Sequence, residues 1–432
     1  MMIVTAVLAL LTVFLMIGSV FLLPQVRFGK FRIGGYCFFA LLGAVALVVA
    51  GSVSLPALRD GIFGAGQVNP LKLLLLFLSM TVFSIVLDEL GFFRWLAVWV
   101  LERAGNSQWV LFFCLYIIAS VLTVFTSNDI VILTFTPFIC SFCRRAGIRP
   151  LPYLIAEFAA ANTWSMALLI GNPTNIYITA ATGIDFFSYI GVMFLPTVAA
   201  GAVSLGMLFL LFHRSLAEPM QTVCEPEELA DRPLLVLALA HLFVCLMLLT
   251  ASGYIGLEMW LCSSALAASL ILCTLLYHAI TGGAPGVLWR TVRRMPWELV
   301  PFLLSMFTLV MALSESGWLA RLSSLFGTEG AVFTYGVSSF FVANLVNNIP
   351  MSVLYAGLID ISGGLPAAYA TVIGSNLGAC LTPVGALAGI MWSDILRREG
   401  VSFRYGDFLR YGAAISLPAL AAALGALMLT LP

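Results

Sequence analysis

Short clusters of polar residues interrupt the long apolar stretches of this sequence at four places. One cluster holds a carboxylate, which can exchange a proton or hold a small cation, and the others supply amide and hydroxyl groups that hydrogen-bond a neutral solute. No Lys or Arg falls at these breaks, so an anion would depend on helix N-termini and amide donors alone. The candidate binding residues are Ser127, Asn128 and Asp129 in the first cluster, Asn162, Asn172, Thr174 and Asn175 in the second, Asn347 and Asn348 in the third, and Asn376 and Thr382 in the fourth.

Two acidic residues within apolar stretches are candidates for a role in transport. Asp129 falls at a break near the centre of its stretch, and an ionisable group inside a membrane is a functional-site hypothesis by default. Its counterpart in the second half of the chain, Asn348, cannot ionise, so Asp129 predicts proton coupling or the binding of a single cation. A neutral Asp129 with a structural role is the alternative. Glu157 lies about 9 Å into its stretch at 1.5 Å per residue, and either relays protons or reaches the inner interface.

The composition is that of a polytopic membrane protein. Of the 432 residues, 62% are hydrophobic and 9% are charged, against about a quarter charged in soluble domains, and the mean hydropathy is +1.07. The first stretch, MMIVTAVLALLTVFLMIGSVFLLP, lacks a basic leader and a cleavage site, so we expect a retained first span. The zero net charge predicts no nucleic-acid partner. The sequence contains no HExxH or GxSxG motif and no clustered His and Asp, and therefore predicts neither an enzyme nor a metal site.

The apolar stretches predict ten membrane spans, since a span needs about 20 apolar residues. Two more apolar regions, 108–143 and 331–359, each turn at a polar tip. Their return arms, 130–143 and 350–359, are shorter than the roughly 30 Å hydrocarbon core, so we expect re-entrant hairpins. The predicted spans are 2–23, 33–50, 71–90, 151–182 (interrupted), 185–212, 233–251, 254–279, 296–314, 365–393 (interrupted) and 408–431.

The basic residues orient these spans, because Lys and Arg concentrate in cytoplasmic loops. Seventeen of the 20 fall on one side of the predicted map and three on the other, which predicts that both termini lie outside the cytoplasm. The three on the other side are Arg59, Lys72 and Arg321.

The two halves of the chain resemble each other. LLLLFLSMTVFSIVLDELGFFRWLA (73–97) aligns with LVPFLLSMFTLVMALSESGWLARL (299–322), and SNDIVIL (127–133) falls opposite VNNIPMS (346–352). An odd number of spans per half requires the second half to be inverted. We therefore predict an all-α polytopic membrane protein, an inverted repeat of five spans plus one re-entrant hairpin per half, with two broken helices. Its parts are a first repeat (1–213), a cytoplasmic linker (214–232) and a second repeat (233–432).

This architecture is typical of secondary transporters, whose substrate site lies near the midplane where discontinuous helices meet. The backbone freed at a helix break cannot face lipid, and is tolerated only against protein or a water-filled cavity. The four polar clusters are therefore expected to converge on one cavity.

The chain resembles the arsenite efflux permeases, the arsenical pump membrane proteins of the ion-transporter superfamily, through most of its length after residue 70. The similar segments are LFLSMTVFSIVLDELGFFRWLA, FTSNDIVILTFTPFI, NNIP, IGSNLGACLTPVGALAGIMW and FLRYGAAISLPALAAALGALML. GNPTN (171–175) is also similar to the break motifs of sodium/proton antiporters and of dicarboxylate or citrate symporters in the same superfamily.

The resemblance implies a plasma-membrane permease that expels arsenite or antimonite in exchange for protons and confers arsenical resistance. It implies no cofactor beyond the transported solute and the coupling ion, H⁺ or Na⁺. It further implies a homodimer and, in some members, a cytoplasmic ATPase subunit. A sodium/proton antiporter and a sodium-coupled dicarboxylate or citrate symporter remain the alternatives.

Overall fold

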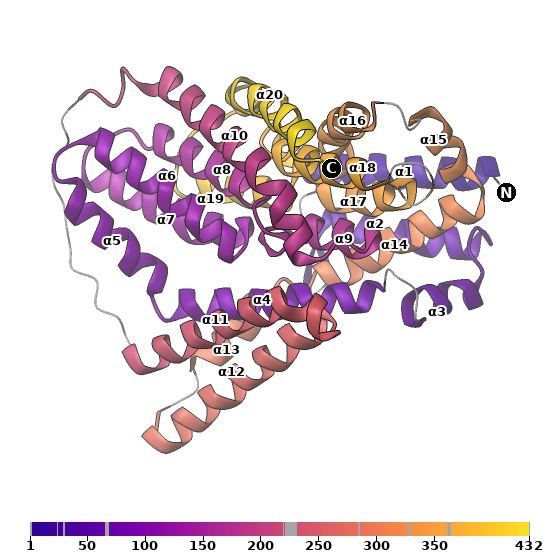
Figure 1. Cartoon of the computed structure of the whole chain (residues 1–432), viewed down its shortest axis with the longest axis horizontal. Helices are drawn as coiled ribbons and strands as arrows, with labels where there is room; N and C mark the ends of the chain where they lie inside the picture. The colour runs from indigo at the N-terminus through magenta and orange to yellow at the C-terminus, as the bar shows by residue number, and fades with distance from the viewer. Residues whose placement is uncertain are drawn as a thin grey trace.

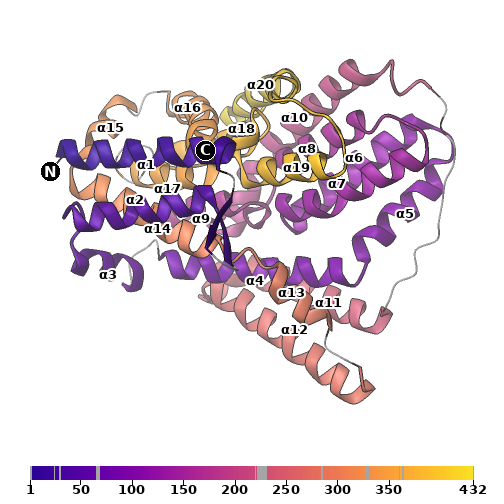
Figure 2. The same ribbon diagram turned by 180° about the vertical axis from the view of Figure 1, so that it is seen from behind.

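The computed structural model describes residues 2–23, 25–28, 31–64, 69–218, 220, 231–283, 286–326, 330–359, 361 and 364–431. These residues form helices and one short hairpin of two antiparallel strands, β1 (Gln25–Phe28) and β2 (Phe31–Gly34). Figure 2 shows this hairpin between the end of α1 (Met2–Leu22) and the start of α2 (Gly35–Val49).

The rest of the first half follows as a series of long and short helices. In chain order they are α3 (Leu55–Phe63), α4 (Pro70–Glu89), α5 (Phe92–Ala104), α6 (Gln108–Phe125), α7 (Asn128–Arg145), α8 (Leu151–Trp164), the 3₁₀ turn η1 (Leu169–Gly171), α9 (Pro173–Thr182) and α10 (Phe186–Phe212).

The second half repeats this order of long, short and interrupted helices. Its elements are α11 (Arg232–Ile255), α12 (Met259–Thr281), α13 (Gly286–Arg294), α14 (Leu299–Glu315), α15 (Trp318–Phe326), α16 (Ala331–Val346), α17 (Asn348–Leu358), α18 (Gly364–Gly378), the 3₁₀ turn η3 (Pro383–Gly385), α19 (Leu387–Arg398) and α20 (Tyr405–Thr430).

The protein is a multi-pass membrane protein. Each of the ten predicted spans coincides with one of these helices or, where an interruption was predicted, with a pair of them. Among the described residues, eight helical segments are long and apolar enough to cross a membrane by themselves. They are Met2–Ser19, Pro70–Glu89, Gln108–Phe125, Phe186–Phe212, Arg232–Ser252, Met259–Thr281, Gly286–Glu315 and Tyr405–Thr430.

Several elements differ from the hydropathy map. The short helices α3, α5, α13 and α15 and the β1–β2 hairpin lie in segments for which the apolar pattern predicts no span. The return arm α7 has 18 residues, about 27 Å, and is longer than the 14-residue arm expected, whereas α17 has 11. Most of the predicted linker, residues 219 and 221–230, lies outside the described residues.

Local sequence explains where the two predicted interruptions fall. After α8 ends at Trp164, Asn172 caps α9 by accepting a hydrogen bond from the Thr174 amide, and Pro173 occupies the first helical position, where it needs no hydrogen-bond partner. The break between α18 and α19 also contains a proline-led 3₁₀ turn, η3. Both breaks lie in buried chain, as unpaired backbone in a membrane requires.

The helices pack so that the broken segments lie inside. In Figure 1, α11, α12 and α13 lie below the rest of the molecule along α4, and α10 and α20 lie next to each other. The helix pairs α16–α18 and α9–α18 are in contact, so α18 and its break are covered by other helices. This packing brings both broken segments and both hairpin tips into the interior.

Candidate functional site

A cavity of about 450 Å³ opens between elements of both halves. Its walls come from the start of α2, one face of α4, the first two turns of α7, the segment from Arg294 to Leu299, and the first turn of α19. Mostly apolar side chains cover these walls, among them Phe77, Ile85 and Leu133. A cavity of this size holds a small solute with several waters.

Asp129 lies in this cavity at the N-terminal end of α7. Its backbone amide donates to the Asn128 side chain at 3.0 Å, but its carboxylate makes no hydrogen bond or ion pair with any described residue. Ser127, the residue that precedes α7, lines the same cavity. The helix N-terminus favours negative charge at this position, so Asp129 is a carboxylate free to bind a solute or a proton.

Three further charged residues line the cavity. Glu298, which directly precedes α14, accepts hydrogen bonds from the Gly34 amide at 3.0 Å and from the Tyr36 hydroxyl at 3.3 Å. Asp88 and Arg294 form an ion pair at 2.6 Å. Arg294 also contacts Glu89 at 2.7 Å, so its charge is already paired.

Four of the candidate residues meet in a buried network away from this cavity. The Asn376 side chain accepts from the Asn172 amide at 2.9 Å and donates to Asn175 at 2.7 Å, which joins α18 to the start of α9. The Thr174 and Ser375 hydroxyls lie 3.0 Å apart in the same contact. All of these side chains are fully enclosed, with exposed fractions of 0 to 1%.

The network extends to the first hairpin tip through Ser165. The Ser165 hydroxyl lies 2.8 Å from both the Asn162 carbonyl and the Asn376 side chain, and the Asn128 amide donates to the Asn162 side chain at 3.0 Å. Because the amides of this network already have protein partners, its first role is to hold the two broken helices together.

The second hairpin tip lies behind one wall of the main cavity. Asn347 lines a small hollow whose walls include Tyr36 and Ile390, which also line the main cavity. Asn347 donates to the Val384 carbonyl at 3.0 Å, while Thr382 donates to the Asn344 side chain at 2.7 Å.

The backbone at this tip is strained. Asn347 has φ of 74° and ψ of 153°, and it is the one non-glycine residue with positive φ in the described chain. Such a conformation costs on the order of 1–3 kcal/mol and is concentrated at functional sites in proteins. The adjacent Asn348 is buried, and its side chain forms no hydrogen bond with the described residues.

Glu157 lies elsewhere, in the helical core. Only 1% of it is exposed, and the Thr136 hydroxyl is within 2.9 and 3.1 Å of its two carboxylate oxygens. Neither residue lines the main cavity. The structure therefore separates the two acidic residues that the sequence singles out.

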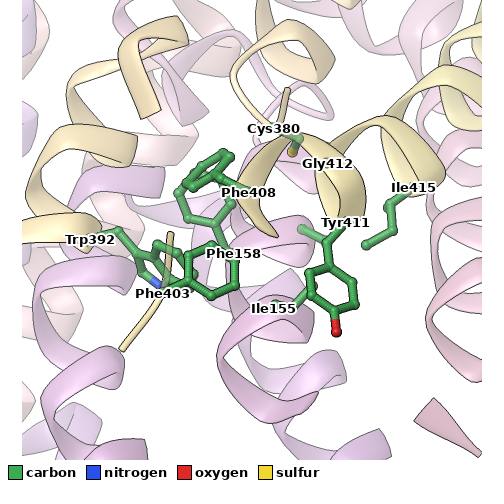
Figure 3. A pocket seen from close by; sticks show the side chains of 10 residues that line it. Ile155, Phe158, Cys380, Trp392, Phe403, Phe408, Tyr411, Gly412 and Ile415 are labelled. Carbon is green, nitrogen blue, oxygen red and sulfur yellow. The ribbon is translucent and has the colours of Figure 1, made fainter. Parts of the chain in front are cut away.

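A hollow next to Glu157 is apolar and small. Figure 3 shows Phe158, Trp392, Phe403, Phe408 and Tyr411 around a space of about 20 Å³. It has room for little more than one water and offers almost no polar surface. It is not suited to hold a polar solute.

The sequence did not point to Glu298, Tyr36 or Asp88 as binding residues. Glu298 and Tyr36 fall in the first residues of predicted spans and Asp88 near the end of one, where polar side chains are ordinary. A useful signal was available: Glu298 follows Arg294 by four residues and stands as an acidic residue inside the predicted span 296–314.

Comparisons with known proteins agree with this architecture. A family model described as citrate transporter (CitMHS) matches residues 35–363. The arsenical pump membrane protein of Escherichia coli strain K12 is 29% identical over 416 residues, covering 91% of this chain and 93% of that protein. The arsenical pump membrane protein of Yersinia enterocolitica is 30% identical over 380 residues, covering 82% and 85%.

A solved structure shares the fold. The crystal structure of the YdaH transporter of Alcanivorax borkumensis superposes with a TM-score of 0.54 at 14% identity, covering 99% of this chain and 97% of that chain. These matches confirm the resemblance stated from the sequence, and they show a transporter rather than an enzyme. This chain therefore belongs to the citrate transporter (CitMHS) family of secondary transporters, together with its relatives the arsenical pump membrane proteins.

Proposed function

We propose that this transporter expels arsenite and antimonite in exchange for protons, with Asp129 as the coupling residue. The observation that carries the proposal is the free carboxylate of Asp129 in a 450 Å³ cavity at the N-terminus of α7. The relatives named arsenical pump membrane proteins support an arsenical as the substrate.

The chemistry of the cargo fits this carboxylate. Arsenite is neutral at physiological pH and presents hydroxyl groups, which donate hydrogen bonds to an ionised carboxylate and accept them from hydroxyl donors such as Ser127. A proton that binds Asp129 removes part of its acceptor capacity and its charge. Proton and solute thus compete for one group, and this competition couples their opposite movements.

The candidate residues take four roles in this proposal. Ser127 and Asp129 contact the solute directly, and Asn128, Asn347, Asn348 and Thr382 shape the two hairpin tips. Asn162, Asn172, Thr174, Asn175 and Asn376 hold the broken helices in register. Glu157 serves as a buried proton-binding group off the main path.

The transport cycle we propose uses an inverted repeat of residues 1–213 and 233–432 joined by the linker 214–232. The 17-to-3 distribution of basic residues supports two outside termini and a cytoplasmic linker. The hairpin-bearing elements then rock or slide against the remaining spans, which exposes Asp129 to each side in turn. In this scheme the protein acts in the plasma membrane as a homodimer and accepts a cytoplasmic ATPase subunit.

Arsenite accumulation in inverted membrane vesicles energised by a proton gradient tests the proposal. The parent protein should accumulate arsenite, and Asp129→Asn should reduce uptake to the level of vesicles without the protein, because the amide cannot exchange a proton. Asp394→Asn is the matched control, since Asp394 pairs with Arg397 and Arg398 at the surface and should leave uptake intact.

The same vesicles test the second candidate, which the description of the family model favours. If the parent takes up no arsenite but accumulates citrate, or exchanges sodium for protons, then arsenite is the wrong substrate. Uptake of arsenite by Asp129→Asn at the parent rate would remove Asp129 from the coupling step.

A further inference from the structure

Glu298 is, with Asp129, one of two cavity-lining carboxylates that form no ion pair with the described residues, and it comes from the other half of the chain than Asp129. Tyr36 Oη and the Gly34 amide both donate to the same oxygen, Oε2. The other oxygen, Oε1, forms no hydrogen bond with the described residues. Two donors fix the carboxylate on the wall while one oxygen stays available to the cavity.

Among the residues that the structure describes, no cation forms an ion pair with Glu298. The described cation that lines the cavity is Arg294, which contacts both Asp88 and Glu89, and Glu89 also contacts Arg290. Two arginines and two acidic residues therefore balance each other. The described titratable or charged groups that line the cavity, contact its charged residues or lie next to them in sequence are Tyr36 and Cys37 from α2, Asp88 and Glu89 from α4, Asp129 from α7, and Arg290, Arg293 and Arg294 from α13.

Of these, Arg293 is turned to the Trp289 ring, with its guanidinium carbon 4.7 Å from the ring centroid, and does not line the cavity. Beyond the Asp88–Arg294 pair, the described lining of the cavity thus carries two carboxylates, Asp129 and Glu298, and no further cation. Mostly apolar walls screen these charges less than water does, so their field persists across the cavity.

We propose that Glu298 is the residue that sets the charge selectivity of this cavity, admitting protons, cations and neutral hydroxides and rejecting carboxylate anions. This inference deepens the proposed function, since it explains why a member of a family described as citrate transporters takes an uncharged cargo. Glu298 acts beside Asp129 but needs no proton exchange of its own.

Thiol-reagent kinetics measure this charge without any transported substrate. Leu133 lines the cavity one turn after Asp129 and is 39% exposed, so Leu133→Cys places a reporter there. Its reaction rates with a cationic and an anionic methanethiosulfonate of similar size are compared in purified protein, with the parent protein as the blank. We expect the cationic reagent to react faster, and Glu298→Gln to lower the ratio of the two rates on the order of threefold.

Three variants in the Leu133→Cys background separate charge from structure. Glu298→Asp should keep the ratio, and so should Tyr36→Phe, which removes one hydrogen bond and no charge. Glu399→Gln, which removes a surface carboxylate paired with Arg144, should also keep it. If Glu298→Gln does not fold, Glu298→Ser applies the same test.

An unchanged ratio in a folded neutral variant would overturn the inference. So would a ratio that falls equally in Tyr36→Phe, because the effect would then come from wall geometry. Since the assay uses no arsenite, a failure of arsenite uptake counts against the proposed function and leaves this result standing.

Discussion

Hydrogen-bond satisfaction separates the candidate residues more sharply than their type does. Asn172, Asn175 and Asn376 look like binding residues in the sequence, yet in the structure they bind one another. Asp129 has no such partner and faces a cavity. A buried amide whose hydrogen bonds are all made within the protein stabilises the fold. A polar group that lines a cavity and lacks a hydrogen-bond partner is available to a ligand.

Replacement of Asn376 should therefore affect stability strongly. Asn376→Leu removes its bonds to Asn172, Asn175 and Ser165 and leaves their polar groups buried without partners. We expect a loss of about 2–4 kcal/mol, seen as a lower melting temperature in detergent. Asn348→Leu is the matched control, because Asn348 is buried without a side-chain hydrogen bond to described residues and should change the melting temperature little. Equal shifts in both variants would contradict a stabilising network.

At the scale of elements, the close crossing of α16 and α18 depends on glycine residues at their contact. A Cβ atom added at Gly374 would lie 2.0 Å from Ser339 Oγ and 2.3 Å from the Gly336 carbonyl, and one at Gly378 would lie 2.6 Å from the Phe340 carbonyl. Small residues four apart let helices in membranes approach closely, and here they bring α18 and its break against α16.

Gly374→Ala should separate these helices. The added methyl group meets backbone that cannot move aside, so we expect a loss of about 1–3 kcal/mol in spite of the better helix propensity of alanine. Gly206→Ala is the control, because nothing lies within 4 Å of a Cβ atom there, and its melting temperature should stay equal or rise. A Gly374 variant as stable as the control would show that α16 and α18 are less tightly packed than described.

The sequence predicted the long elements well because hydropathy and span length are local properties. It predicted the breaks as well, since Asn172, Pro173 and Pro383 are local signals. It did not predict that Glu298 would lie in the same cavity as Asp129, because that depends on how helices from the two halves pack. Nor did it distinguish Asn376 in a closed network from Ser127 in a cavity, since both are small polar residues at a break.

At the scale of the whole molecule, α14 connects two hollows. Its first residue, Leu299, lines the main cavity, and Ser314 lines a second hollow of about 230 Å³ together with Tyr177 and Leu319. The two residues are about 22 Å apart along the helix. Between the hollows lie Leu74, Leu303, Ile176 and Ile349, which surround a space of only about 20 Å³.

This arrangement predicts access from opposite sides of the membrane. An impermeant thiol reagent added to intact cells should label Ser314→Cys, which is exposed, and should not label Leu133→Cys. In inverted vesicles the preference should reverse. The parent protein, whose described cysteines are buried or half-buried, gives the background. Labelling of both positions from one side would contradict the proposed orientation.

The contact between Asn172 and Asn376 also bears on how the protein is made. The two residues are 204 positions apart, so at about 5–20 residues per second the second is synthesised about 10–40 s after the first. During that interval the first broken helix is in the membrane with buried amides that lack their final partners. The first half therefore cannot complete its polar network by itself. Until α18 is synthesised, we expect its amides to be hydrogen-bonded by the insertion machinery or by water.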